Sequence, residues 1–155
     1  MTIGISQLVL GDATLEETLD VCRAARYEAV ELVFKGGKDL DVDLGNSELR
    51  AIKGRCESSG VRVTSVIALT QDRGSLLSLN EQDRRRYGES VVRALEIADE
   101  LDAGAVLLPI QASSNPRALT TRCGAMCAIV WRSLLARQRS GRWPSVWRMS
   151  GTKLF

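Results

Sequence analysis

The sequence predicts an α/β fold built on a parallel sheet, and two observations lead to this prediction. In residues 1–108, short apolar segments typical of buried strands alternate with longer segments whose apolar residues recur at helical spacing. The helical segments also open on capping residues. Strands that alternate with helices pair in parallel, because each helix returns the chain to the same end of the sheet.

The first strand and helix are expected within residues 3–26. Residues 3–6 have the composition of a short buried strand. Thr14 and Glu17 have the spacing of a capping box, in which each side chain satisfies a free backbone amide of the other residue. A helix is therefore expected to run to about Arg26, with apolar positions at Leu15, Leu19, Cys22 and Ala25.

The second strand and helix follow the same rhythm. Residues 29–33 are nearly apolar on both faces, as expected of a parallel strand covered by helices, and residues 34–46 are expected to form a loop. Ser47 is expected to cap a helix that ends at Gly60, a residue type that tolerates a left-handed C-terminal cap. The apolar positions of this helix are Leu49, Ile52 and Cys56.

The remaining elements are a third strand over residues 61–69, a third helix and a fourth strand over residues 105–108. Asn80, together with Asp83, is expected to open the helix, and Gly104 leads into the last strand. The apolar stripe of the third helix is Val91, Val92, Leu95, Ala98 and Leu101.

The first turn and the chain length distinguish two ways of closing this sheet. An open, doubly wound sheet usually has a glycine-rich phosphate-binding first turn, and residues 6–12 have no such pattern. The other closure is a (β/α)₈ barrel, which needs about 250 residues. We therefore expect residues 1–108 to form the N-terminal half of a (β/α)₈ TIM barrel, followed by an irregular C-terminal tail.

Composition predicts a globular, cytoplasmic protein, since 45% of the residues are hydrophobic and 26% are charged. No apolar stretch approaches the ~20 residues needed to span a bilayer, and no secretory leader is recognisable, so no membrane contact is expected. The chain has no His, and its four Cys lack a zinc-binding spacing. We expect reduced, structurally neutral thiols, and no nucleophile that depends on a His base.

Four segments together are typical of one protein family: residues 3–6, 27–32, 58–63 and 98–108. Through them, residues 1–108 resemble the sugar phosphate isomerase/epimerase family of xylose isomerase-like TIM barrels. Arg26 departs from the family, which commonly has Gly at this position. Because the position often requires a positive φ, Arg26 is expected to cost about 1 kcal/mol there.

The resemblance implies a metal-dependent isomerase or epimerase that acts on a sugar or a sugar phosphate. In such relatives, two Glu, an Asp and a His from strands five to eight hold a divalent metal such as Mn²⁺, Mg²⁺ or Co²⁺, while carboxylates move a proton between adjacent carbons. We expect no catalytic residue, metal ligand or cofactor in this chain, which would then be a truncated, inactive member. The alternative is a noncatalytic half-barrel fragment that self-associates through its inner apolar face and open strand edges.

Three residues are candidates for lining a substrate pocket. Glu31, at the end of the second predicted strand, is placed to accept a hydrogen bond from a sugar hydroxyl, whereas the alternative is a structural ion pair with a Lys or Arg. Gln7, after the first strand, and Ser65, within the third, are further candidates, with ordinary loop or core roles as the alternative. Residues 35–38 could meet a substrate phosphate, although a solvated loop is the simpler interpretation.

The charge pattern changes at residue 108. All 19 acidic residues precede it, beside 13 Lys and Arg, whereas residues 109–155 contain eight basic residues and no acidic one. All three Trp and all three Pro also lie in this tail. Since a soluble surface normally mixes both signs, we predict that residues 109–155 are a separate, largely non-native segment.

A shifted reading frame explains the composition of the tail. With permitted synonymous codons, regrouping residues 147–152 one base earlier gives Glu-Asn-Val-Trp-Asn, which contains the Glu-Asn pair that commonly ends the family's fifth strand. The same regrouping turns residues 119–141 into an acidic, helix-forming sequence. We therefore expect a frameshift over roughly residues 109–152. A nucleic-acid-binding arm of Arg and Trp is the rival interpretation, but no arrangement places these residues on one platform, so no nucleic-acid partner is expected.

Overall fold

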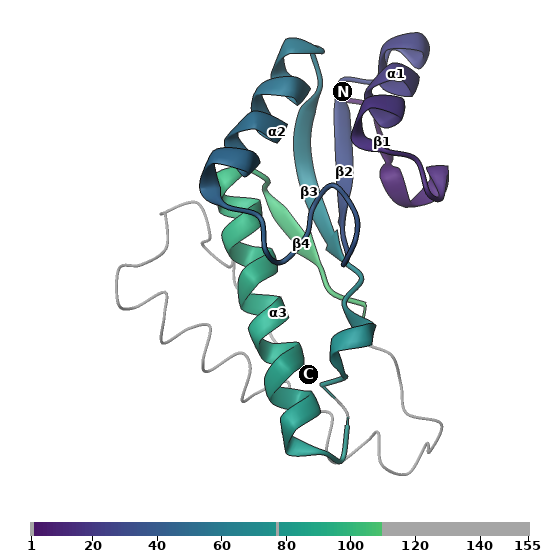
Figure 1. Ribbon diagram of the computed structural model, residues 1–155. Coiled ribbons are helices and arrows are strands. Elements are labelled where there is room, and N and C mark those ends of the chain that lie inside the picture. Colours follow the sequence, from purple (N-terminus) through teal and green to yellow (C-terminus); the bar gives the residue numbers. More distant parts are fainter. Residues whose placement is uncertain (1, 77, 110–155) are drawn as a thin grey trace, which may run out of the picture.

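A computed structural model describes residues 2–76 and 78–109 of the chain. Strands, helices and two short 3₁₀ turns alternate along it (Figure 1). In chain order the elements are β1 (Gly4–Ser6), η1 (Gln7–Leu10), α1 (Leu15–Ala25), β2 (Ala29–Phe34), α2 (Asn46–Ser58), β3 (Arg62–Ala68), η2 (Gln71–Arg73), α3 (Glu81–Glu100) and β4 (Ala105–Leu107). The irregular structure predicted for the tail, together with Cys123 and Cys127, lies outside the described residues.

The four strands form one parallel sheet in the order β1-β2-β3-β4. Each of the three α-helices connects two neighbouring strands, as Figure 1 shows. The prediction of a parallel sheet in chain order is therefore confirmed. The described residues contain no helix that is long and apolar enough to cross a membrane.

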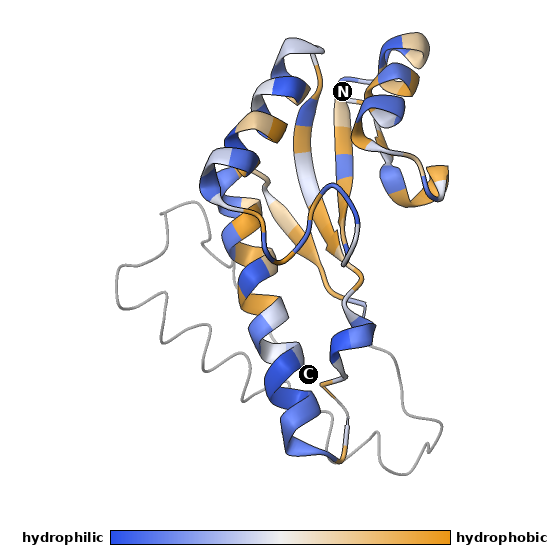
Figure 2. Ribbon diagram, in the orientation of Figure 1, coloured by the Kyte–Doolittle hydropathy of each residue, from blue (hydrophilic) through white to orange (hydrophobic). Residues whose placement is uncertain are grey.

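The main hydrophobic core lies between one face of the sheet and the three helices. Val30, Leu32 and Phe34 alternate along β2 and all belong to this core. Leu19 of α1, Ile52 of α2 and Ile97 of α3 belong to the same cluster, so all three helices cover the same face. Figure 2 shows the opposite character at the N-terminal half of α3, which is strongly hydrophilic.

The helix ends follow the local sequence signals closely. Thr14 Oγ1 accepts a hydrogen bond from the Glu17 amide at 3.3 Å, and Glu17 Oε2 accepts one from the Thr14 amide at 2.7 Å, so the capping box is confirmed. Arg26 has φ 57°, the left-handed conformation expected there, and Gly60 has φ 72°. Asn80 caps α3 as predicted, since its side chain accepts from the Gln82 amide at 2.9 Å.

The start of α2 differs from the prediction, which placed the cap at Ser47. The helix begins at Asn46, and Gly45 is its N-cap. The Gly45 amide donates to Glu48 Oε2 at 2.7 Å, and the Gly45 carbonyl accepts the first helical hydrogen bonds. Because a cap needs extended backbone and a partner three residues on, Glu48 fixes the start two residues earlier than expected.

Two of the predicted helix stripes are also corrected. Ala25 is exposed, and Thr18 takes a core position in α1 instead, with its hydroxyl donating to the Thr14 carbonyl at 2.8 Å. In α3, Val92 and Leu95 are only half-buried. The buried face of α3 is turned slightly from the predicted stripe, and consists of Tyr87, Ser90, Val91, Ala94, Ile97 and Ala98.

Candidate active site face of the sheet

Glu31 lies on the face of the sheet that the helices do not cover. Its neighbours Val30 and Leu32 point into the core, and successive side chains of a strand point to opposite faces. The Glu31 side chain is therefore half-buried on the inner face. Since β2 extends to Phe34, Glu31 is in the middle of its strand and not at the end, where it was predicted.

Two serine hydroxyls hold the Glu31 carboxylate. Ser6 Oγ donates to Glu31 Oε1 at 2.7 Å, and Ser65 Oγ donates to Glu31 Oε2 at 2.8 Å. The sheet register brings these residues together, because Ser6 is opposite Glu31 in β1 and Ser65 is opposite Glu31 in β3. Hydroxyl-to-carboxylate hydrogen bonds are among the stronger ones in proteins, so the carboxylate is firmly oriented.

A β-bulge at Thr64 places Ser65 beside Glu31. The register passes from the pair Val30 with Val63 directly to the pair Glu31 with Ser65, so Thr64 is an extra residue in β3. Val63 and Val66 both belong to the core although they are three positions apart, which simple alternation does not allow. Bulges of this kind change the direction of a side chain, and this one turns Ser65 to the inner face.

Gln7 has a different environment from Glu31. Its side chain is 4% exposed, and its Oε1 accepts a hydrogen bond from the Val33 amide at 3.0 Å. Its Nε2 donates to the Ala13 carbonyl at 3.2 Å. Both ends of the Gln7 amide thus bond to backbone and hold η1 against β2, while a role in binding substrate stays a prediction.

The Glu31 carboxylate keeps capacity for a further partner. Among residues 2–76 and 78–109, none of the ion pairs includes Glu31, so the alternative of a structural ion pair has no support there. A carboxylate has about four acceptor positions, and the two serines use two of them. The remaining positions suit a ligand that donates hydrogen bonds.

The described residues do not fit a divalent metal. They contain no group of three or more His, Cys, Asp or Glu side chains placed to hold one. Around Glu31 the donors are two serine hydroxyls that already bond to the carboxylate, whereas catalytic zinc-type sites use three protein ligands from imidazole, thiolate or carboxylate groups. The metal implied by the family resemblance would need ligands from outside this part of the chain.

Two polar groups of the loop after β2 have partners within the protein. Lys38 Nζ lies 3.0 Å from Asp12 Oδ1, and this pairing lowers the pKa of Asp12. The Gly37 amide donates to Asp41 Oδ2 at 2.7 Å. These groups therefore have partners within the protein, which favours the interpretation of residues 35–38 as a structural loop.

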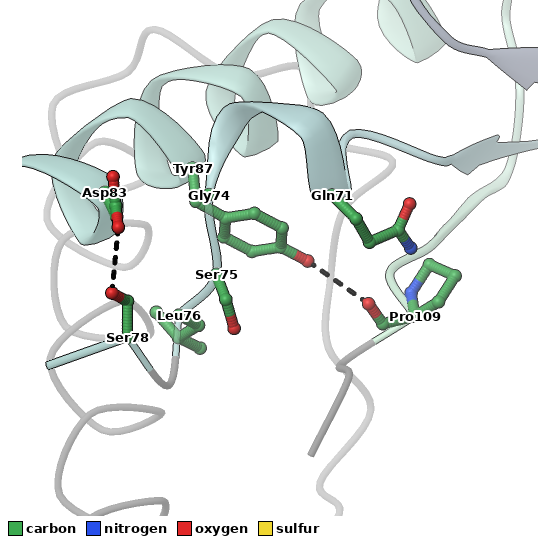
Figure 3. A pocket seen from close by; sticks show the side chains of 8 residues that line it. All are labelled: Gln71, Gly74, Ser75, Leu76, Ser78, Asp83, Tyr87 and Pro109. Atoms are coloured by element: carbon green, nitrogen blue, oxygen red, sulfur yellow. Dashed lines mark hydrogen bonds between the residues drawn. The ribbon is translucent and has the colours of Figure 1, made fainter. Parts of the chain in front are cut away.

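A small pocket of about 180 Å³ lies where β3 and β4 end (Figure 3). Its walls come from the loop after β3, the start of α3 and Pro109. In Figure 3, Ser78 donates to Asp83 at 3.0 Å, and the Tyr87 hydroxyl donates to the Pro109 carbonyl at 3.4 Å. Hydrogen bonds from Arg86 and from Ser78 lower the pKa of Asp83, and burial raises the pKa of Tyr87.

A second, larger cavity of about 350 Å³ lies at the other end of the sheet. Its walls include Gly60 and Val61, just before β3, and Leu101, just after α3. The location of a cavity is a better guide to function than its volume. The ligand sites of parallel barrels lie at the C-terminal ends of the strands. The smaller pocket is at that end, and the larger cavity is not.

The geometry described so far is half of a parallel barrel with its helices outside and Glu31 inside. A sequence model of the xylose isomerase-like TIM barrel matches residues 19–139. The chain belongs to this family. The matched residues extend past residue 108, and the boundary expected there stays a prediction. No curated protein matches the chain significantly.

Solved structures of xylose isomerase-like barrels resemble this one. They include a 3-keto-D-glucoside 4-epimerase from E. coli, with 17% identity, a TM-score of 0.64 and coverage of 91% of this chain and 53% of that chain. A D-psicose 3-epimerase from Clostridium cellulolyticum has 13% identity, a TM-score of 0.65 and coverage of 88% and 49%. A xylose isomerase domain protein from Planctomyces limnophilus has 15% identity, a TM-score of 0.58 and coverage of 89% and 50%.

These likenesses establish the fold, and the chain spans about half the length of the solved structures it matches. Within the xylose isomerase-like fold, the inner face of the sheet becomes the barrel interior.

The sequence predicted Glu31 and Ser65 as residues of this inner face, and it missed Ser6, whose hydroxyl also bonds to the Glu31 carboxylate. Asp83 was expected only to help open the third helix, and the structure shows that it also lines the pocket at the strand ends.

Proposed function

We propose that the chain contributes the first half of a barrel that isomerises or epimerises a sugar, and that Glu31 binds a sugar hydroxyl in the barrel interior. The observation that carries this proposal is the Glu31 carboxylate, which two serine hydroxyls orient on the inner face. A carboxylate with unused acceptor positions is suited to the hydroxyl donors of a sugar. Two of the similar structures are epimerases whose names specify sugar substrates, which supports the same substrate class.

Ser6 and Ser65 are positioning residues in this proposal. Each hydroxyl donates to one oxygen of Glu31, so the carboxylate plane is held across three strands. A ligand then finds the acceptor already oriented and does not have to immobilise a flexible side chain. Loss of either hydroxyl would loosen the carboxylate and weaken binding without removing its charge.

We further propose that the 155-residue chain has no turnover by itself. Moving a proton between adjacent carbons needs an acid or base at each carbon and stabilisation of the charge that develops on oxygen. On the inner face of the described strands, Glu31 supplies a single carboxylate that is already engaged by two hydroxyls. The remaining groups would come from the strands that the family resemblance places fifth to eighth.

The test begins with the nucleotide sequence around the codon of Leu108. Restoring one base there should open a longer frame that encodes four further strands, with additional carboxylates and at least one His. An alternative frame that holds only stops or unrelated sequence would contradict the frameshift. Both proteins are then assayed on a panel of ketoses and ketose phosphates with Mn²⁺, Mg²⁺ or Co²⁺.

The restored protein should turn over at least one sugar, and the 155-residue chain should turn over none. Glu31→Gln in the restored protein should lower kcat/KM by about 10- to 100-fold, the worth of one hydrogen bond to a charged group. Glu28→Gln is the matched control, because Glu28 is exposed before β2, and it should leave kcat/KM unchanged. EDTA-sensitive turnover by the 155-residue chain would refute its inactivity. A restored protein that is inactive on every sugar would remove the support for the proposed activity.

A further inference from the structure

The Gln7 side chain takes the place of a strand at the point where β1 ends. The last residue pair between β1 and β2 is Ser6 with Glu31. Two residues farther along β2, the Val33 amide points to the same side as the Glu31 amide, because backbone groups of alternate residues point to the same neighbouring strand. β1 has ended there, and Gln7 Oε1 accepts the hydrogen bond from the Val33 amide at 3.0 Å. The pairing of β1 with β2 therefore continues for one further step through a side chain.

The other end of the Gln7 amide fixes the chain after the turn. Its Nε2 donates to the Ala13 carbonyl at 3.2 Å, and the residue is 4% exposed. The turn η1 lies between these two anchors, so both its start and its exit are held against β2. Loss of the Gln7 amide would leave the buried Val33 amide without an acceptor, which is more costly than the loss of a solvent-exposed hydrogen bond.

Ser6 lies at the junction that Gln7 fixes. The Ser6 hydroxyl oxygen accepts a hydrogen bond from the Leu8 amide at 3.3 Å and so caps η1. The same hydroxyl donates to Glu31 Oε1 at 2.7 Å. The bond from Leu8 exists because the chain turns into η1 directly after Ser6. The direction of the Ser6 hydroxyl, and with it the support of one Glu31 oxygen, therefore depends on where β1 ends.

We propose that Gln7 is a positioning residue for the Glu31 carboxylate and that it acts through Ser6. This inference rests on the proposed role of Glu31 in binding a sugar hydroxyl. By ending β1 at Ser6, the Gln7 amide directs the Ser6 hydroxyl at Glu31, so the acceptor is oriented before a ligand arrives. Without the Gln7 side chain, the backbone of residue 7 is free to pair with Val33, and β1 then runs past Ser6. Gln7 acts in this way without contacting the sugar itself.

The test compares Gln7→Met, Ser6→Ala and the double variant in the 155-residue chain. Met keeps the length of the Gln side chain and removes both hydrogen bonds. The readout is the ¹³C chemical shift of the Glu31 side-chain carboxyl group, which changes when a hydrogen-bond donor is lost. Each single variant should move this signal in the same direction, and Gln7→Met should move it no further in the Ser6→Ala background. Two residues that act independently would instead give additive shifts.

Thr18→Val is the matched control, because Thr18 is 0% exposed in α1 and its hydroxyl donates to the Thr14 carbonyl, so this variant also loses a buried hydrogen bond. It should destabilise the chain and leave the Glu31 signal unchanged. Gln7→Asn, whose side chain is too short to reach both Val33 and Ala13, replaces Gln7→Met if circular dichroism shows that the latter does not fold. A Glu31 signal that the Gln7 variants do not move, or additive shifts in the double variant, would overturn the proposal.

Kinetics of the restored protein give a second readout. Gln7→Met should lower kcat/KM by about tenfold, the worth of one hydrogen bond, and by no further factor in the Ser6→Ala background. A further tenfold loss in that background would contradict action through Ser6. Because the Glu31 signal needs no turnover, a restored protein that is inactive on every sugar would count against the proposed function and not against the role of Gln7.

Discussion

Gly74 offers a sharp test of the pocket wall, because it is the point where the loop after β3 meets the start of α3. Its φ is 120°, a conformation that residues with a side chain rarely adopt. A Cβ added to Gly74 would lie 2.5 Å from the Asp83 carbonyl oxygen and 3.0 Å from the Asp83 Cα. Both are backbone atoms of a helix, so neither can rotate away as a side chain would.

The expected cost of Gly74→Ala follows from these two effects. A residue forced into a rare backbone conformation costs about 1–3 kcal/mol, and inserting a carbon into a packed site costs about 1–3 kcal/mol. Since relaxing the loop relieves both at once, we expect the free energy of unfolding to fall by about 3 kcal/mol. Urea denaturation followed by circular dichroism measures the change.

Gly88→Ala is the matched control, with the opposite sign expected. Gly88 lies within α3, and a Cβ added there would have no neighbour within 4 Å. Replacing Gly by Ala inside a helix raises stability by about 0.8–1 kcal/mol. The same substitution should thus destabilise the protein at position 74 and stabilise it at position 88. If Gly74→Ala is neutral, the loop does not pack on α3 as described.

Three further predictions concern the helices and their ends. Arg26→Gly should raise the free energy of unfolding by about 1 kcal/mol in urea denaturation, because Arg26 has φ 57°; an unchanged midpoint would contradict the left-handed cap. Burial, together with the nearby charges of Glu100 and Asp102, raises the pKa of Asp99, so the ionised carboxylate destabilises the fold at neutral pH. This destabilisation disappears as the pH falls through the raised pKa and Asp99 becomes protonated. Asp99→Asn should therefore raise the free energy of unfolding by about 0.3–1 kcal/mol near pH 7, as expected for removing an anion from a helix C-terminus. In acid, urea denaturation should show no difference between the variant and the original protein. Burial raises the pKa of Cys56 to about 11, so at about pH 8 site-resolved mass spectrometry should show its alkylation at least about 100-fold slower than in the unfolded chain.

The fold was predictable where short-range chemistry decides it. The capping box of Thr14 and Glu17 needs only residues three apart, and the structure forms it. The left-handed conformation of Arg26 was expected from the family resemblance, because the family commonly has Gly at this position, and the structure gives it φ 57°. The start of α2 was missed because Glu48 bonds to the backbone of Gly45, and a backbone amide has no signature in the sequence.

The candidate site was predictable only in part. Glu31 stands out because it is the one charged residue in an otherwise apolar strand. Ser6 does not stand out, since a serine at a strand end is common and its role depends on which strand lies beside it. That pairing is a property of the whole sheet, so local sequence patterns cannot supply it.

The bulge at Thr64 shows how the core determines the site. Val63 and Val66 are buried at 4% and 0% exposure, and both are needed to fill the space beneath α2 and α3. With regular alternation, residues 63 and 66 would face opposite sides, so one extra residue is required between them. Thr64 is that residue, and its hydroxyl donates to the Val30 carbonyl at 3.3 Å. The side chain that follows then faces inward, and this is why Ser65 meets the carboxylate of Glu31.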